Sequence, residues 1–356
     1  MKKIKLGLLP KIIIAIILGI GFGIVSPDMP VRVFVTFNAL FSEFLGFLIP
    51  LIIVGLVTPA IADIGKGAGK LLVITALMAY GATVFSGFLS YGVGQAVFPA
   101  LITDNLQLAQ ISEAKGIEPF FTVSIPASLN IMTALVLAFT FGLGIAHLES
   151  HTLKSMFCEF RDIITKTIQV VVLPLLPIYI FGIFFNMTHS GEVFKVLSVF
   201  VKIIGVIFVM HIFLLIFQYF VASLFVRKNP LRLLLNMMPA YFTALGTQSS
   251  AATIPVTLRQ TINNGVNKDI AGFVIPLCAT IHMSGSCMKI TACALTICLL
   301  DGLPHDPMLF LNFIMMLGIM MVAAPGVPGG SIMAALAPLA MILGFGKEEQ
   351  ALMIAL

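Results

Sequence analysis

Charged residues are scarce in this 356-residue chain: Asp, Glu, Lys and Arg make up 10% of it, whereas 59% is hydrophobic. A soluble globular domain has about 25% charged residues. So few charges cannot cover a water-facing surface, and lipid must therefore cover much of the protein. The net charge of +5 does not indicate a nucleic acid partner, because the basic residues lie in short loops, where they set membrane orientation.

Other features are missing as well. The apolar runs do not alternate with polar residues, which excludes a membrane β-barrel and leaves helices as the spanning elements. The first run lacks a small-residue cleavage site, which predicts a span rather than a signal peptide. The five cysteines form no disulfide framework, since four of them lie in one apolar stretch. No linker has the length of a soluble domain.

Apolar stretches near the roughly 20 residues needed to cross a bilayer recur along the whole chain. The nine stretches are roughly 6–25, 33–62, 71–102, 129–147, 163–187, 198–226, 233–258, 270–300 and 308–346. They predict an all-α, multi-pass protein of the plasma (cell inner) membrane. A cytoplasmic amino terminus places the loops with Lys66, Lys154 and Arg227 in the cytoplasm and the loop with Lys115 outside, which is a positive-inside pattern.

Two stretches depart from simple spans. The stretch 233–258 is uncharged, but Arg232 precedes it and Arg259 follows it. Both flanks should be cytoplasmic, which predicts a re-entrant helical hairpin with its turn at 246–250. A Gly- and Pro-rich segment at 324–331 predicts a second hairpin that enters from the other side. Two such hairpins are typical of an inverted-repeat transporter with a site at mid-membrane. Two ordinary kinked spans are the alternative.

Polar residues gather at 279–286, in the middle of the eighth stretch, and predict local unwinding. Helix arms that start at mid-membrane present free N–H groups, which bind anions, and Ser249 and Ser250 add hydroxyl donors. Lys289 is predicted to lie deep in a span, where ionisable groups are functional candidates; the alternative is that its long stem reaches an interface. His282 is either a functional group or a satisfied interior histidine.

Three segments resemble motifs of the dicarboxylate/amino acid:cation symporter family, the glutamate transporter homologues. Residues 247–255 (TQSSAATIP) resemble its serine-rich first-hairpin motif. Residues 275–286 (IPLCATIHMSGS) resemble its seventh-span motif, and 326–329 (GVPG) match the tip of its second hairpin. The motifs occur in the family's order, and the layout agrees over nearly the whole chain.

The resemblance implies a glutamate-transporter-like homotrimer that is not an enzyme. It implies symport of small anionic solutes, either acidic amino acids or C4-dicarboxylates, coupled to Na⁺ or H⁺ and without a further cofactor. An elevator mechanism would move a transport unit, residues 71–102 and 198–346, against a scaffold, residues 1–62 and 129–187. Residues 347–356 would begin an incomplete eighth span.

The resemblance also implies roles for single residues. Those at the substrate would be Gln248, Ser249, Ser250, Ala251, Val327, Pro328 and Gly329. Those at or near the cation sites would be Thr280, His282, Met283, Ser284 and Ser286, with Thr280 and Met283 as candidate Na⁺ ligands. The gate would consist of Gly326, Gly329 and Gly330.

The chain departs from the family's pattern in two respects. His282 and Ser284 replace the Asn and Asp of the seventh-span motif, and Lys289 stands where the family usually has an uncharged residue. We therefore expect Lys289, and His282 with it, to take the place of a bound cation. The sequence also stops at Leu356, before the Asp, Arg and Asn of the eighth span, and Gln248 replaces a hairpin arginine of some members. We expect a fragment of a longer protein.

Three rival functions are compatible with the residues. Ser249 or Ser250 could pair with His282 in an intramembrane serine hydrolase, although no nucleophile-elbow pattern surrounds the serines. A channel is disfavoured, because no repeated filter segment is present. The third rival is an inactive, truncated homologue that still forms a trimer through its scaffold.

Overall fold

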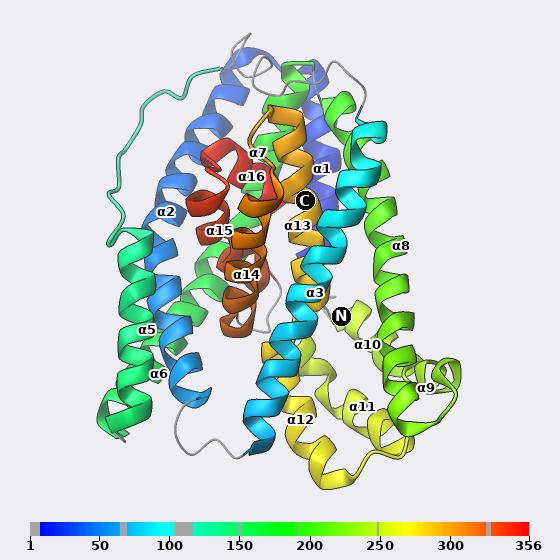
Figure 1. The fold of residues 1–356 in the computed structure, drawn as a ribbon. Coiled ribbons are helices and arrows are strands. Elements are labelled where there is room, and N and C mark those ends of the chain that lie inside the picture. Colours follow the sequence, from blue (N-terminus) through cyan, green and yellow to red (C-terminus); the bar gives the residue numbers. More distant parts are fainter. Residues whose placement is uncertain are drawn as a thin grey trace, which may run out of the picture.

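The computed structural model describes residues 8–64, 70–102, 117–148, 151–191, 193–247, 249–324 and 329–355. Within these ranges all regular elements are helices, as predicted, and most of them run along a common direction in one bundle (Figure 1). Five helical segments in this part of the chain are long and apolar enough to cross a membrane: Asp28–Ala62, Lys70–Leu101, His151–His189, Leu197–Val226 and Lys268–Asp301.

One group of helices packs around α2. Its members are α1 (Leu8–Val25), α2 (Asp28–Ile64), α5 (Ile131–Leu148), α6 (His151–Thr167), the π-helical η1 (Ile168–Val172) and α7 (Leu173–His189). Helix α1 packs mainly on α7, and α2 packs on α5, α6 and α7. Fully buried large side chains such as Ile52, Ile53 and Tyr179 fill the space between them. Burial of each such side chain contributes about 1.5–3 kcal/mol where water is the alternative.

The residues around Cys158 form the regular helix α6, which begins before the apolar stretch 163–187. Phe157 and Ile164 are seven residues apart, so they share one helix face, and both are buried. The helix continues through η1 into α7, where Pro174 has no N–H to donate to the preceding turn. The π-helical turn accommodates this missing hydrogen bond.

A second group packs around α3 and α13. Its helices are α3 (Lys70–Leu101), α8 (Val193–Val226), α9 (Pro230–Asn236), α10 (Met238–Thr247), α11 (Ser250–Asn263), α12 (Lys268–Ile281), α13 (Ser284–Asp301), α14 (Pro307–Ala323), α15 (Gly330–Ile342) and α16 (Lys347–Ala355). Helix α3 lies along α13 and also contacts α12 and α14. Helix α13 is almost entirely buried, which explains why its apolar residues show no single apolar face.

The helices are interrupted where the sequence predicted it. Helix α10 ends at Thr247 and α11 begins at Ser250; the two pack against each other. Helices α12 and α13 are separated by His282 and Met283, which confirms the predicted unwinding. Helix α14 ends at Ala323 and packs against α15. Residues 325–328 of the second interruption lie outside the described part of the chain.

Candidate functional site

Local side-chain hydrogen bonds connect the two sides of the interruption between α10 and α11. Ser249 is the N-cap of α11, and its hydroxyl accepts from the backbone N–H of Ala252 at 3.3 Å. The Thr253 hydroxyl donates to the carbonyl of Ser249 at 2.8 Å and lies 3.3 Å from the Thr247 hydroxyl. Ser249 therefore uses its hydroxyl as a helix cap. Two other residues predicted to lie at the substrate cannot be placed: Gln248 and the side chain of Ala251 lie outside the described part of the chain.

The interruption between α12 and α13 exposes backbone groups. His282 adopts φ −104° and ψ 95°, and Met283 adopts φ −121° and ψ 46°, so neither residue is helical. Met283 provides no side-chain cap for α13, so the first N–H groups of that helix have neither a helical partner nor a side-chain cap. The hydroxyl of Thr280 donates to the Leu277 carbonyl of its own helix at 2.8 Å.

Helix α13 is held to its neighbours by polar side chains that the sequence analysis did not single out. Ser86 of α3 donates to the carbonyl of Ser284 at 2.7 Å, and Ser90, one turn later, donates to the carbonyl of Met288 at 2.8 Å. His211 of α8 has its Nε2 atom 3.1 Å from the carbonyl oxygen of Gly285. The signal that could have identified them is a polar residue inside an otherwise apolar span.

Lys289 lies on α13, as predicted, and its side chain is exposed. The residues around it in the helix, Cys287, Met288 and Ile290, are buried. Ser284 is buried, and Ser286 is half-buried. The predicted cation-site residues therefore occupy the end of α12, the interruption and the first two turns of α13.

The second interruption ends at Gly329, whose φ of 76° is left-handed. This conformation favours glycine, because a side chain would clash with the backbone. Gly330 is buried at the start of α15. The other predicted gate and substrate residues of this segment, Gly326, Val327 and Pro328, lie outside the described residues.

A cavity of about 640 Å³ lies between α8 and the helices α10, α11 and α12. Ser250 and His282 both line it, so the structure brings these two predicted residues to one space. Thr280, Met283, Ser284, Ser286 and Lys289 do not line it. Among the described helices, no extensive contact joins α10 or α11 with α14 or α15.

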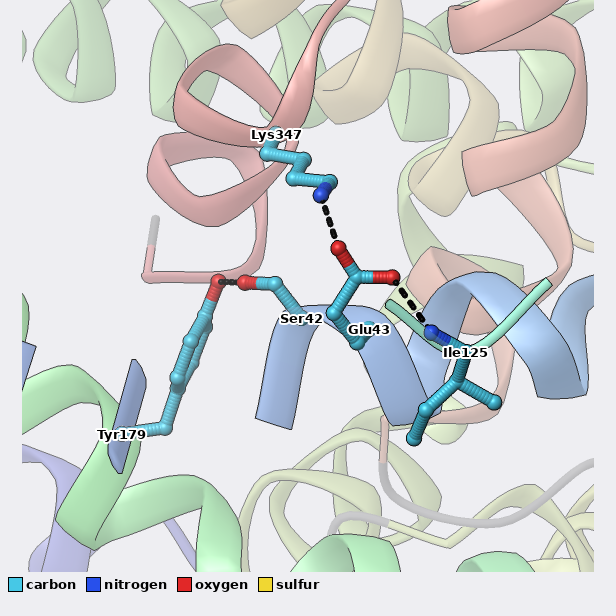
Figure 2. A network of polar contacts seen from close by, with 5 residues as sticks. All are labelled: Ser42, Glu43, Ile125, Tyr179 and Lys347. Carbon is cyan, nitrogen blue, oxygen red and sulfur yellow. Dashed lines mark hydrogen bonds and ion pairs between the residues drawn. The ribbon is translucent and has the colours of Figure 1, made fainter. Parts of the chain in front are cut away.

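A polar network connects α2 with α16 (Figure 2). The Glu43 carboxylate forms an ion pair with Lys347, and its second oxygen accepts from the backbone N–H of Ile125 at 3.3 Å. The neighbouring Ser42 hydroxyl lies 3.0 Å from the hydroxyl of Tyr179. Glu43 thus joins three parts of the chain: α2, the extended segment before α5, and the first residue of α16.

Comparison with known families decides the class of this protein. The model of the sodium:dicarboxylate symporter family matches residues 8–356. The chain belongs to this family. A relative, the serine/threonine transporter SstT of Streptococcus suis (strain 05ZYH33), is 26% identical over 341 residues, and the match covers 92% of this chain and 93% of the relative.

Family membership confirms several expectations. The protein is a multi-pass membrane transporter and not an enzyme, so the sharing of one cavity by Ser250 and His282 does not indicate a hydrolase. Sodium is the coupling ion of the family.

Proposed function

We propose that this protein is a secondary active symporter of small anionic solutes, acidic amino acids or C4-dicarboxylates, that moves its substrate by an elevator mechanism. The observation that carries the proposal is the pair of uncapped helix starts at Met283 and Gly329. The amino-terminal end of a helix carries about half a positive charge and unpaired N–H groups, which bind carboxylates. In this proposal α10/α11 and α14/α15 are the two re-entrant hairpins of an inverted repeat.

The residues at the substrate are proposed to be those that the resemblance implies. Ser249, Ser250 and Gly329 contribute together with Gln248, Ala251, Val327 and Pro328. Gly326, Gly329 and Gly330 form the gate. Glycine at these positions allows the backbone to approach a ligand closely.

Sodium is proposed to bind at the interruption between α12 and α13. The hydroxyl of Thr280 and the backbone carbonyl groups of Met283 and its neighbours offer oxygen ligands, which hard cations prefer. Ser284 stands where the family has an acidic residue and supplies no negative charge. We propose that Lys289, assisted by His282, supplies positive charge in place of one bound cation, which would lower the number of Na⁺ ions or allow H⁺ coupling.

The packing of the helices supports the elevator proposal. The most extensive contacts lie within the group around α2 and within the group around α3 and α13. The first group coincides with the proposed scaffold and the second with the proposed transport unit. We propose that the scaffold also forms the homotrimer contacts.

Uptake of radiolabelled solutes into proteoliposomes tests the proposed function. Aspartate, glutamate and C4-dicarboxylates are offered under an inward Na⁺ gradient, an inward H⁺ gradient, or neither. The expected result is concentrative uptake of at least one acidic solute that is driven by the Na⁺ gradient. No gradient-driven uptake of these solutes in vesicles that contain the folded protein would contradict the proposal.

A second candidate substrate class is the neutral hydroxy amino acids. The relative named above is a serine/threonine transporter, and no arginine or lysine lines the cavity that holds Ser250 and His282. A second carboxylate would therefore have no paired guanidinium among these lining residues. The same assay separates the candidates, because serine uptake that aspartate does not inhibit would assign the neutral class.

A further inference from the structure

The cavity between α8 and α10–α12 holds Ser250 and His282, but it is far more apolar than a small polar solute requires. Its walls are mostly apolar and include Leu215, Leu234 and Ile275. The polar side chains of Ser250, Thr253, Thr257 and His282 also line it, and none of the described lining residues is Asp, Glu, Lys or Arg. Most of this space offers a dicarboxylate or an amino acid no hydrogen bond in exchange for those that it makes with water. The volume of about 640 Å³ is in the range of ligand-binding pockets, roughly 300–1,000 Å³. A hydrocarbon chain fits this chemistry.

The cavity borders an exposed apolar surface of the chain. Three of its lining residues, Ile212, Ile216 and Tyr241, are 57%, 43% and 42% exposed. Helix α8 supplies two of them. It has the highest hydropathy of the candidate spans, and only 33% of its most apolar window is buried. A membrane lipid can therefore enter the cavity from the bilayer without crossing water.

Basic residues stand at one end of the cavity. Arg227 follows α8 eight residues after the lining residue Tyr219, about 12 Å along the helix. Lys268 begins α12 seven residues before the lining residue Ile275, so it lies on the same helix face about 10 Å away. The lower ends of α8 and α12 lie at the same end of the bundle (Figure 1).

Three further cations lie just after α8, on α9 and on α11. Lys228 donates to the Asn264 carbonyl at 2.8 Å and ties the end of α8 to the turn after α11. Arg232 lies on α9 and Arg259 on α11. In the described part of the chain, no acidic side chain forms an ion pair with any of these five cations. The cavity thus combines an apolar interior with a rim that carries five cations and one acidic residue, Asp269, beside Lys268.

We propose that this cavity binds an anionic glycerophospholipid, with an acyl chain between α8 and α10–α12 and the phosphate at Arg227 and Lys268. Basic pockets between membrane helices recognise anionic headgroups, and each Lys or Arg near the surface contributes about 1 kcal/mol. The bound lipid packs between α8 and α10/α11 and holds the helix pair against α12. This inference does not depend on which solute is transported.

The absence of tryptophan from the chain allows a test without background fluorescence. A Tyr219→Trp variant places a single tryptophan in the cavity. The matched control is Leu77→Trp, because Leu77 is 65% exposed on α3. It lies seven residues from Lys70 at the basic end of the bundle, a depth comparable to that of Tyr219, which lies eight residues from Arg227. Each variant is reconstituted in phosphatidylcholine that contains increasing amounts of phosphatidylglycerol with brominated acyl chains, which quench tryptophan on contact.

The expected result is half-maximal quenching of Tyr219→Trp at a mole fraction of brominated phosphatidylglycerol several-fold lower than for Leu77→Trp. Brominated phosphatidylcholine should quench both reporters alike. Adding Arg227→Gln and Lys268→Gln to Tyr219→Trp should abolish the preference of this reporter for phosphatidylglycerol over phosphatidylcholine. Adding Lys268→Arg to Tyr219→Trp should retain that preference. Equal quenching of the cavity reporter by the two lipids would overturn headgroup recognition. No quenching by either lipid would overturn occupancy by an acyl chain.

Discussion

At the scale of single residues, Lys289 is the exposed side chain in a buried stretch of α13. If it replaces the charge of a bound cation, Lys289→Met removes that charge without shortening the side chain much. We expect Na⁺-driven uptake to fall about tenfold, which corresponds to about 1.4 kcal/mol, or to require a higher Na⁺ concentration. The measurement is the initial rate of uptake at a series of Na⁺ concentrations.

The control for this variant is Lys202→Met, which removes an exposed lysine from α8. It should keep the parent's rate and Na⁺ dependence. If Lys289→Met also matches the parent in both, Lys289 has no role in coupling.

Ser90 offers a residue-scale test of how α13 is held in place. Its buried hydroxyl donates to the Met288 carbonyl at 2.8 Å. Ser90→Ala removes this hydrogen bond while the Met288 carbonyl keeps its helical one, which costs about 0.5–1.5 kcal/mol. We expect a lower midpoint of thermal unfolding in detergent micelles. Ser223→Ala removes an exposed hydroxyl that bonds within its own helix and should leave the midpoint unchanged; equal midpoints for both variants would show that the α3–α13 hydrogen bond adds no stability.

At the scale of helices, the ion pair between Glu43 and Lys347 joins the proposed scaffold to the last helix of the chain. An elevator movement of α16 against α2 must break it, so the pair stabilises the position seen in Figure 2. The Lys347 side chain is 65% exposed, and exposed pairs contribute about 0.2–1 kcal/mol. Lys347→Gln should therefore shift the equilibrium away from this position by up to about fivefold. Distances between spin labels on α2 and α15 measure the shift.

A second ion pair on α2 provides the matched control. Asp28 of α2 pairs at 2.9 Å with His189, the last residue of α7, so the pair lies within the group of helices around α2. Asp28→Asn should leave the distance distribution unchanged, whereas Glu43→Lys combined with Lys347→Glu should restore the parent's distribution. An unchanged distribution in Lys347→Gln would mean that the pair does not oppose the movement.

At the scale of the whole molecule, the sequence predicted the helical class, the family and the positions of the three interruptions. These features follow from local signals: apolar length, Gly and Pro placement, and polar residues inside apolar runs. The contacts that hold α13, made by Ser86, Ser90 and His211, depend on which helices become neighbours, and one sequence does not reveal that. The amphipathic helix around Cys158 was missed because its charges resemble those of a loop, although Phe157 and Ile164 share a face.

The charges also predict how the whole bundle lies in the membrane. Helix α3 begins at Lys70, α8 ends before Arg227 and α12 begins at Lys268, all at one end of the bundle (Figure 1). The His305 carbonyl accepts from Tyr91 in the second half of α3, so His305 lies toward the opposite end. The positive-inside rule places the basic end in the cytoplasm. We therefore expect His305→Cys to react with a membrane-impermeant maleimide in intact cells.

Asn229→Cys, beside Arg227 at the basic end, should react with the same maleimide only after the membrane is permeabilised. Both variants are compared with the parent, whose cysteines in α13 are buried, so that labelling of the native thiols can be subtracted. The reverse pattern, with Asn229→Cys labelled in intact cells and His305→Cys protected, would place the basic end outside. It would also remove the anionic cytoplasmic leaflet as the source of lipid for the cationic rim. The orientation and the lipid site are therefore linked, since both follow from the cations that end α8 and begin α12.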